Sequence, residues 1–171
     1  MRKIFTILFA LVAMVSFAQP KVNVRLDMGG TFGNMTEAQL KSLRGDAWSE
    51  EWESTVKPAI LQDMIYEMNK TIKGIYLFGK FDDASLDLLV TLIHMDEDDD
   101  DTEFVVTCSF MKSDGSKTLL FTEPKEEDGK DTKKFTRITS KSFVEAASGV
   151  AFSFKRNITK ASKKHPELLD L

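Results

Sequence analysis

Hydrophobic and polar residues alternate along the segment that follows residue 20. A period of two is typical of a strand with one buried face, so we expect a strand over 21–28. Three glycines then interrupt the pattern, and the letters T-E-A-Q from Thr36 have the spacing of a capping box. We therefore expect a short helix from Thr36 toward Leu43 that ends at Gly45. The apolar positions of the strand are Val22, Val24, Leu26 and Met28.

From Trp48 to Ile72 the apolar residues recur every three or four positions, which is the spacing of a helix with one buried face. Pro58 lies inside this segment. Proline lacks the backbone N–H and is tolerated only in the first turn of a helix or at a kink. Either two helices meet near Lys57, or one helix bends there. Gly74 ends the helical pattern.

Four further segments have the length and the apolar or alternating composition of strands. An acidic turn and then the pair Asp114-Gly115 join the last three, so these should form an antiparallel meander. A polar loop (123–130), a last short strand (135–138) and a second helix from Phe143 to Ile158 should follow, before a flexible tail over 165–171. The four segments are 75–81, 86–95, 103–111 and 117–122.

These elements predict an α+β fold. We expect a mostly antiparallel, four- to five-stranded sheet with two main helices packed on one face. A chain of 171 residues suits one domain, which we place over 19–164. The single cysteine excludes an internal disulfide, so packing must supply the stability.

The first 18 residues have the pattern of a secretory signal peptide. Arg2 and Lys3 precede an apolar run over 4–15, and Ser16 and Ala18 are the small residues that the peptidase requires. The run is shorter than the roughly 20 apolar residues of a membrane span. We therefore expect cleavage after Ala18, a bacterial protein that is periplasmic or secreted, and no membrane span once the signal is removed.

The net charge of −4 becomes more negative when the two basic residues of the signal peptide are removed. Nucleic acids and anionic membranes attract basic surfaces, so we expect neither as a partner.

The letters D-M-G-G-T at 27–31 are similar to the first phosphate loop of sugar-kinase-type ATPases. The chain is too short for the second phosphate loop and the adenosine pocket that such enzymes need, so we expect no nucleotide and no cofactor. We interpret the glycines as residues that allow positive backbone angles where the first strand turns into a helix.

The acidic run at 96–101 is a weak calcium candidate through Asp96, Asp98 and Asp100, whose alternation imitates an EF-hand loop. The imitation fails, because Asp101 stands at the glycine position and Thr107 stands at the glutamate position. We interpret the run as a solvated hairpin tip that discourages edge-to-edge pairing, and we predict no metal site.

Candidates for catalysis are few. Cys108 lies in an alternating apolar run, and we interpret it as a core residue rather than a nucleophile. His94 ends a predicted strand and has no neighbour at catalytic or ligand spacing. Asp82, Asp83 and Asp87 lack the pattern of a paired carboxylate site. We assign no catalytic residue.

The order of elements between Trp52 and Ile158, with D-L-L-V at 87–90 and the Asp114-Gly115 hairpin, resembles small periplasmic adaptor domains. These are typified by the amino-terminal domain of TolB and by envelope-assembly lipoproteins. The resemblance implies a non-enzymatic domain that docks to envelope partners. The chain departs from the lipoproteins because it has no cysteine at the cleavage site.

The leading hypothesis is therefore an exported interaction domain that binds another envelope protein or itself. A small-ligand- or calcium-binding secreted protein is the alternative, and a hydrolase is less favoured. Phe152 is our partner-binding candidate, because it lies opposite the apolar stripe of the last helix and should be exposed. Arg156 shares its face, and Gly149 would allow a partner to approach closely.

Overall fold

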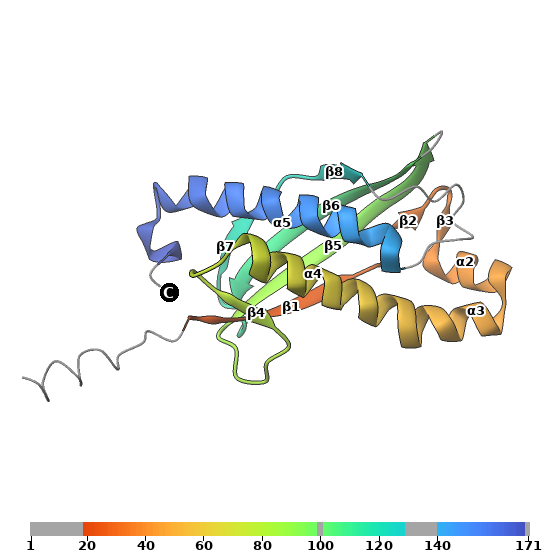
Figure 1. Cartoon of the computed structure of the whole chain (residues 1–171), viewed down its shortest axis with the longest axis horizontal. Helices are drawn as coiled ribbons and strands as arrows, with labels where there is room; N and C mark the ends of the chain where they lie inside the picture. The colour runs from red at the N-terminus through yellow and green to blue at the C-terminus, as the bar shows by residue number, and fades with distance from the viewer. Residues whose placement is uncertain (1–18, 99–100, 129–139, 170–171) are drawn as a thin grey trace, which may run out of the picture.

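The computed structural model describes residues 19–98, 101–128 and 140–169. Its two longest strands, β5 (Leu86–Asp98) and β6 (Asp101–Lys112), pair antiparallel at the centre of the sheet (Figure 1). On one side of β5 lies β1 (Lys21–Asp27), which is parallel both to β5 and to β4 (Leu77–Gly79). On the far side of β6, β7 (Thr118–Phe121) and β8 (Lys125–Asp128) pair antiparallel with its two ends.

The prediction that helices pack with one sheet is confirmed, but the sheet is larger and less regular than predicted. Among the residues that the structure describes, it is mixed and has eight strands, rather than four or five that are mostly antiparallel. The parallel pairing of β1 with β4 has a simple cause. The segment between these strands is mostly helical, and a long connection of this kind is what parallel neighbours require. β8 was also unexpected, since it lies where we predicted a polar loop.

β1 and β2 (Thr31–Phe32) follow one another along the same edge of β5, both parallel to it. Between them the backbone at Gly30 lies so close to β5 that an added Cβ would be 2.3 Å from the carbonyl oxygen of Leu92. The N–H of Gly29 donates to the Asp27 side chain, at 2.9 Å. The glycines therefore let an interrupted strand pack closely on its neighbour, and the N–H of Gly29, which a phosphate would need, is already bonded.

Two details of the predicted turn are wrong. A short hairpin of β2 and β3 (Met35–Thr36) precedes the first helix, so the glycines do not lead directly into it. Of the three glycines at 29, 30 and 33, only Gly33 has a positive φ, 56°. Close approach of two backbones, more than an unusual backbone angle, explains the glycine at position 30.

The first helix, α2 (Glu37–Arg44), begins with the predicted capping box. The Gln39 N–H donates to the Thr36 hydroxyl at 3.3 Å, and the Thr36 N–H donates to the Gln39 side chain at 2.9 Å. These two bonds satisfy backbone donors that would otherwise have no partner at the start of the helix.

The path from α3 (Asp46–Glu51) to α4 (Lys57–Thr71) is one continuous helical run with a wider, π-helical stretch, η1, at Trp52–Val56. Within it the Lys57 N–H bonds the carbonyl of Trp52, five residues earlier. Pro58 follows in the first turn of α4, where its missing N–H does no harm. Of the two predicted alternatives, the single, locally irregular helix is therefore the one formed.

A network of charges attaches α2 to α4. The Glu37 carboxylate accepts from the Trp52 indole at 2.7 Å and pairs with Lys57 at 2.6 Å and with Lys41 at 3.0 Å. Glu53 pairs with the same two lysines, at 3.0 Å from Lys57. Hydrogen bonds from Lys41 and then Lys57 lower the pKa of the Glu53 carboxyl to about 2.

α4 and α5 (Ser140–Ser162) pack against each other across the same face of the sheet, as predicted for the two main helices (Figure 1). The core between them and the sheet is rich in aromatic rings. Phe154 of α5 packs edge-on against Phe78 of β4 and Phe110 of β6, with ring centroids 6.4 and 5.7 Å apart. One face of each helix therefore supplies the hydrophobic stability of the fold.

The outer edge of β4 is closed by a side chain of α4. The Asn69 amide donates to the Phe78 carbonyl at 2.8 Å and accepts from the Phe78 N–H at 3.0 Å. It thus occupies the backbone groups that an additional strand would use.

The prediction of a flexible tail over 165–171 is wrong for part of it. Residues Pro166–Leu168 form a short 3-10 helix, η3, and Leu168 is buried. The hydroxyl of the buried Tyr76 donates to the Leu168 carbonyl, and burial raises the pKa of Tyr76 to about 12. The predicted signal peptide (1–18) and the predicted strand at 135–138 lie outside the described residues.

Candidate functional site

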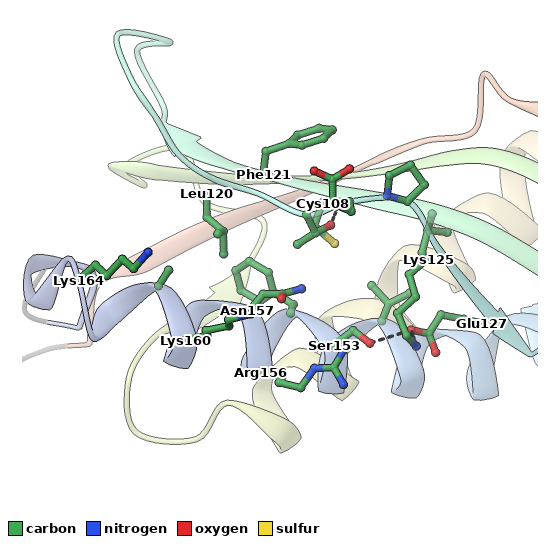
Figure 2. Close-up of a pocket in the computed structure, with 17 residues that line it drawn as sticks. Cys108, Leu120, Phe121, Lys125, Glu127, Ser153, Arg156, Asn157, Lys160 and Lys164 are labelled. Atoms are coloured by element: carbon green, nitrogen blue, oxygen red, sulfur yellow. Dashed lines mark hydrogen bonds and ion pairs between the residues drawn. The ribbon is translucent and has the colours of Figure 1, made fainter.

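A cleft of about 470 Å³ lies between α5 and the edge of the sheet formed by β7 and β8 (Figure 2). Its lining includes the apolar residues Val106, Leu120 and Phe154, together with charged residues of α5, of β8 and of the turns beside them. The volume is within the range of about 300–1,000 Å³ that is common for small-molecule sites.

β7 and β8, which contribute residues to the cleft, do not form one continuous strand. They pair with different parts of β6, and the chain passes between them through Pro124, which has no N–H for strand pairing. Leu120 of β7 points toward α5, whereas its neighbour Phe121 points away (Figure 2). Leu120 pairs with the fully buried Phe110 and yet stays half-buried, so its own surroundings are incompletely filled.

A buried carboxylate joins β8 to α5 at one end of the cleft. Glu127 accepts a hydrogen bond from the Ser153 hydroxyl at 2.8 Å and pairs with Lys125 (Figure 2). A Cβ added at Gly149 would lie 2.0 Å from the Glu127 carboxylate. The absence of a side chain at Gly149 therefore makes room for this carboxylate.

Cys108 and Thr122 form the floor of the cleft. The Thr122 hydroxyl accepts from the Cys108 N–H at 2.8 Å, and the Thr122 N–H donates to the Cys108 carbonyl at 2.9 Å. Burial is the main cause that raises the pKa of the Cys108 thiol to about 12. The thiol is therefore neutral at physiological pH, in keeping with the interpretation of Cys108 as a core residue.

Three cations line the cleft, two from the last turns of α5 and the third, Lys164, from the turn that follows the helix. Arg156, Lys160 and Lys164 are all exposed, and in the described part of the chain none of them forms an ion pair with a carboxylate. Cations near a helix C-terminus complement the helix dipole, which accounts for part of this composition. Their side chains nonetheless remain available to an anion.

A second, shallower groove of about 370 Å³ runs along the outer side of α5. It shares Arg156 and Lys160 with the cleft, so the same two cations separate the two depressions. Its apolar member is Phe152, which is 64% exposed. The residues that line the groove are Phe152, Lys155, Arg156, Thr159, Lys160 and Lys163.

The three partner-binding candidates have different surroundings in the structure. The predicted exposure of Phe152 is confirmed, and Arg156 lies beside it in the groove. The prediction that Gly149 lets a partner approach closely is corrected. The group that lies close to Gly149 is the Glu127 carboxylate of the same chain. Whether Phe152 and Arg156 bind a partner stays a prediction.

The weak calcium candidates lie at the end of the β5–β6 hairpin. Asp96 is exposed, whereas Asp100 and the side chain of Asp98 lie outside the described residues. Among the residues that the structure describes, no group of three or more His, Cys, Asp or Glu side chains could hold a metal ion. Calcium binding at this tip stays untested.

Two polar groups lie close to His94 in the structure, and the sequence did not predict them. Its Nδ1 lies 2.6 Å from the Thr31 hydroxyl, and its Nε2 lies 3.7 Å from the Asp96 carboxylate. The irregularity at Ile93 in the β5–β6 ladder and the pairing of β2 with β5 bring these groups together. None of the three lines the cleft, and we assign no chemistry to them.

Two of the three acidic residues considered for hydrolysis each pair with a different basic residue. Asp83 pairs with Lys21 at 2.6 Å, and the buried Asp87 pairs with Arg25 at 2.8 Å. Asp83 and Asp87 therefore belong to different ion pairs and do not form a paired carboxylate site with each other.

The sequence did not reveal the cleft itself. Two of the residues that line it, Lys125 and Glu127, lie in β8, a segment whose sequence is typical of a polar loop. Leu120 and Ser153 lie in predicted elements, but nothing in the sequence places them near each other. One signal was present: Lys125 and Glu127 are two residues apart, the spacing that puts both on one face of a strand.

In the described part of the chain, no helix is both long and apolar enough to cross a membrane. No protein-family model and no curated protein matches the sequence. Among solved structures, the chain is similar to a protein of Xanthomonas campestris from family DUF330, with 6% identity, a TM-score of 0.47, and coverage of 85% of this chain and 88% of that chain. At this TM-score and identity, the likeness defines neither a shared fold nor a shared function.

Proposed function

We propose that the protein is an exported, non-enzymatic adaptor of the bacterial cell envelope that docks to an acidic partner protein through the outer groove of α5. The observation that carries the proposal is the exposed Phe152 among cations that have no carboxylate partner in the described part of the chain. The signal-peptide pattern at the N-terminus supports export.

The side chains that line the groove indicate the kind of surface that would bind there. An aromatic side chain that becomes buried on binding is a common energetic hot spot of protein interfaces. The four cations of the groove, Lys155, Arg156, Lys160 and Lys163, would attract an acidic surface and speed its association, most strongly at low salt. The complementary surface is therefore acidic, with an apolar depression that accepts the Phe152 ring.

A photocrosslinking experiment tests this proposal. A photoreactive phenylalanine analogue is placed at position 152 in cells, and the same analogue at position 66 is the control. Tyr66 of α4 is 65% exposed, so the two probes are equally accessible. We expect one defined crosslinked protein from position 152, absent from position 66, which mass spectrometry identifies.

The purified partner should then bind the parent protein in a salt-dependent way and should lose affinity at least about tenfold for Phe152→Ser, but not for Tyr66→Ser. Equal crosslinking from both positions, or a salt-independent complex, would contradict the proposal. A crosslink between two copies of this chain would instead establish self-association at the groove.

A further inference from the structure

The cleft between α5 and the sheet has the features of a ligand site, and it differs from the outer groove although both include Arg156 and Lys160. Leu120 points into it and stays half-buried, although its partner across the sheet is fully buried. Ala161, on the facing side of α5, is also only partly buried. Apolar surface on both walls is thus left without a contact from the described part of the chain, and an apolar group entering the cleft would remove it from water.

The charges at the mouth determine the other end of such a ligand. Four cations and two carboxylates line the cleft, which leaves two positive charges in excess in a chain whose net charge is −4. Lys125 is engaged by Glu127. The excess charge is therefore carried by the row Arg156, Lys160 and Lys164, which belong to α5 and to the turn directly after it.

We propose that this cleft binds a long-chain carboxylate, with its acyl chain between Leu120 and Ala161 and its headgroup at the row of cations. A single chain suits a volume of about 470 Å³, which is in the lower half of the range for small-molecule sites. A singly charged headgroup suits the mouth, because Glu123 and Glu127 also line the cleft and would repel a more highly charged one.

The test uses the purified protein and a fluorescent fatty acid, 11-(dansylamino)undecanoate. We expect saturable binding with one site per chain, and displacement by palmitate below its micelle concentration. Methyl palmitate has the same acyl chain and no charge, so it should compete at least about tenfold less well.

Two neighbouring lysines provide a matched pair of variants. Lys164 lines the cleft and Lys163 lines only the outer groove. Lys164→Glu should weaken palmitate binding about tenfold, whereas Lys163→Glu, with the same change of charge, should weaken it less than about twofold. Asn157→Trp should block the cleft, because Asn157 lines it and is only partly buried.

The proposal is overturned if palmitate does not displace the probe, if methyl palmitate competes equally, or if the two lysine variants lose affinity equally. Tighter binding of lysophosphatidylglycerol than of palmitate would also overturn the choice of a carboxylate. If Asn157→Trp does not fold, the lysine pair still decides the matter. In Lys164→Glu the crosslink from position 152 should persist, so failure of ligand binding is distinguishable from failure of partner docking.

Discussion

The two helices that cover the sheet, α4 and α5, differ in whether their basic side chains pair with carboxylates. The cations of α4 are paired: Lys57 contacts both Glu37 and Glu53, and Lys70 contacts Glu67 at 3.0 Å. The basic residues near the end of α5 have no such partner in the part of the chain that the structure describes. Those residues are Lys155, Arg156, Lys160, Lys163 and Lys164.

The exposed aromatic residues differ in the same way. Tyr66 of α4 lies beneath the Lys70 ammonium, 5.8 Å from the ring centroid, whereas Phe152 of α5 lies in a groove. Tyr66 and Phe152 are therefore equally exposed but have different surroundings, since only Tyr66 has a cation over its ring. On α4 the lysines pair with carboxylates, whereas those near the end of α5 do not in the described part of the chain.

The largest effect should come from the buried side of α5. Phe154→Ser removes a ring that packs on Phe78 and Phe110, and it should lower the free energy of unfolding by about 3 kcal/mol or more. Urea denaturation measures this loss. A loss below about 1 kcal/mol would mean that the core rearranges to fill the space.

The contact of α5 with β8 should depend on Glu127. Alanine is favoured over glycine in a helix by about 1 kcal/mol, but at position 149 its Cβ would displace the Glu127 carboxylate from Ser153. We expect Gly149→Ala to destabilise the parent by about 1 kcal/mol, since a hydrogen bond to a charged group contributes more than the helix propensity.

The same substitution should stabilise the Glu127→Ala variant by about 1 kcal/mol, because the clash is then absent. Chemical denaturation of the four proteins completes the cycle. A stabilising effect in both backgrounds would show that the Glu127 side chain moves aside freely.

Acid should loosen the paired charges at the start of α4. The folded-state pKa of Glu53 is lowered from 4.5 to about 2, so its contribution is present above pH 4.5 and is lost as the pH falls toward 2. Because Glu53 is half exposed, we expect only about 0.5–1 kcal/mol. Melting temperatures of the parent and of Glu53→Gln should converge across this interval. Parallel curves would show that the pairing adds nothing to stability.

The smallest effects should come from the two exposed aromatic residues. Phe152→Ser and Tyr66→Ser should each change the free energy of unfolding by less than about 0.5 kcal/mol, because neither ring is part of the core. Thermal unfolding of both variants checks this. A clear loss for Phe152→Ser alone would place its ring among stabilising contacts and would weaken its assignment to docking.

Local features of the fold could be predicted from the sequence because short-range chemistry determines them. The capping box at Thr36, the period of two in β1 and the helical stripe of α4 each follow from neighbouring residues. The parallel pairing of β1 could not be predicted in this way, because it depends on where distant strands meet. The docked position of Leu168 likewise depends on Tyr76, which is far away in the sequence.

The candidate site divides along the same line. The exposure of Phe152 follows from its position on one helix, which the sequence determines. The cleft depends on how β6, β7 and β8 lie relative to α5, which has no local signature in the sequence. Gly149 shows the difference clearly, since only the position of Glu127 reveals why a side chain is absent there.

The two hydrogen bonds between the Asn69 side chain and the Phe78 backbone also affect how the chain behaves before it is fully folded. The outward backbone groups of β4 are occupied by a side chain of α4, so a strand from another molecule cannot add at this edge. That protection exists only once α4 has docked on the sheet. Before α4 docks, the backbone N–H and carbonyl of Phe78 can pair with a strand of another chain. Edge-to-edge association at β4 is therefore expected of newly made protein rather than of the native molecule.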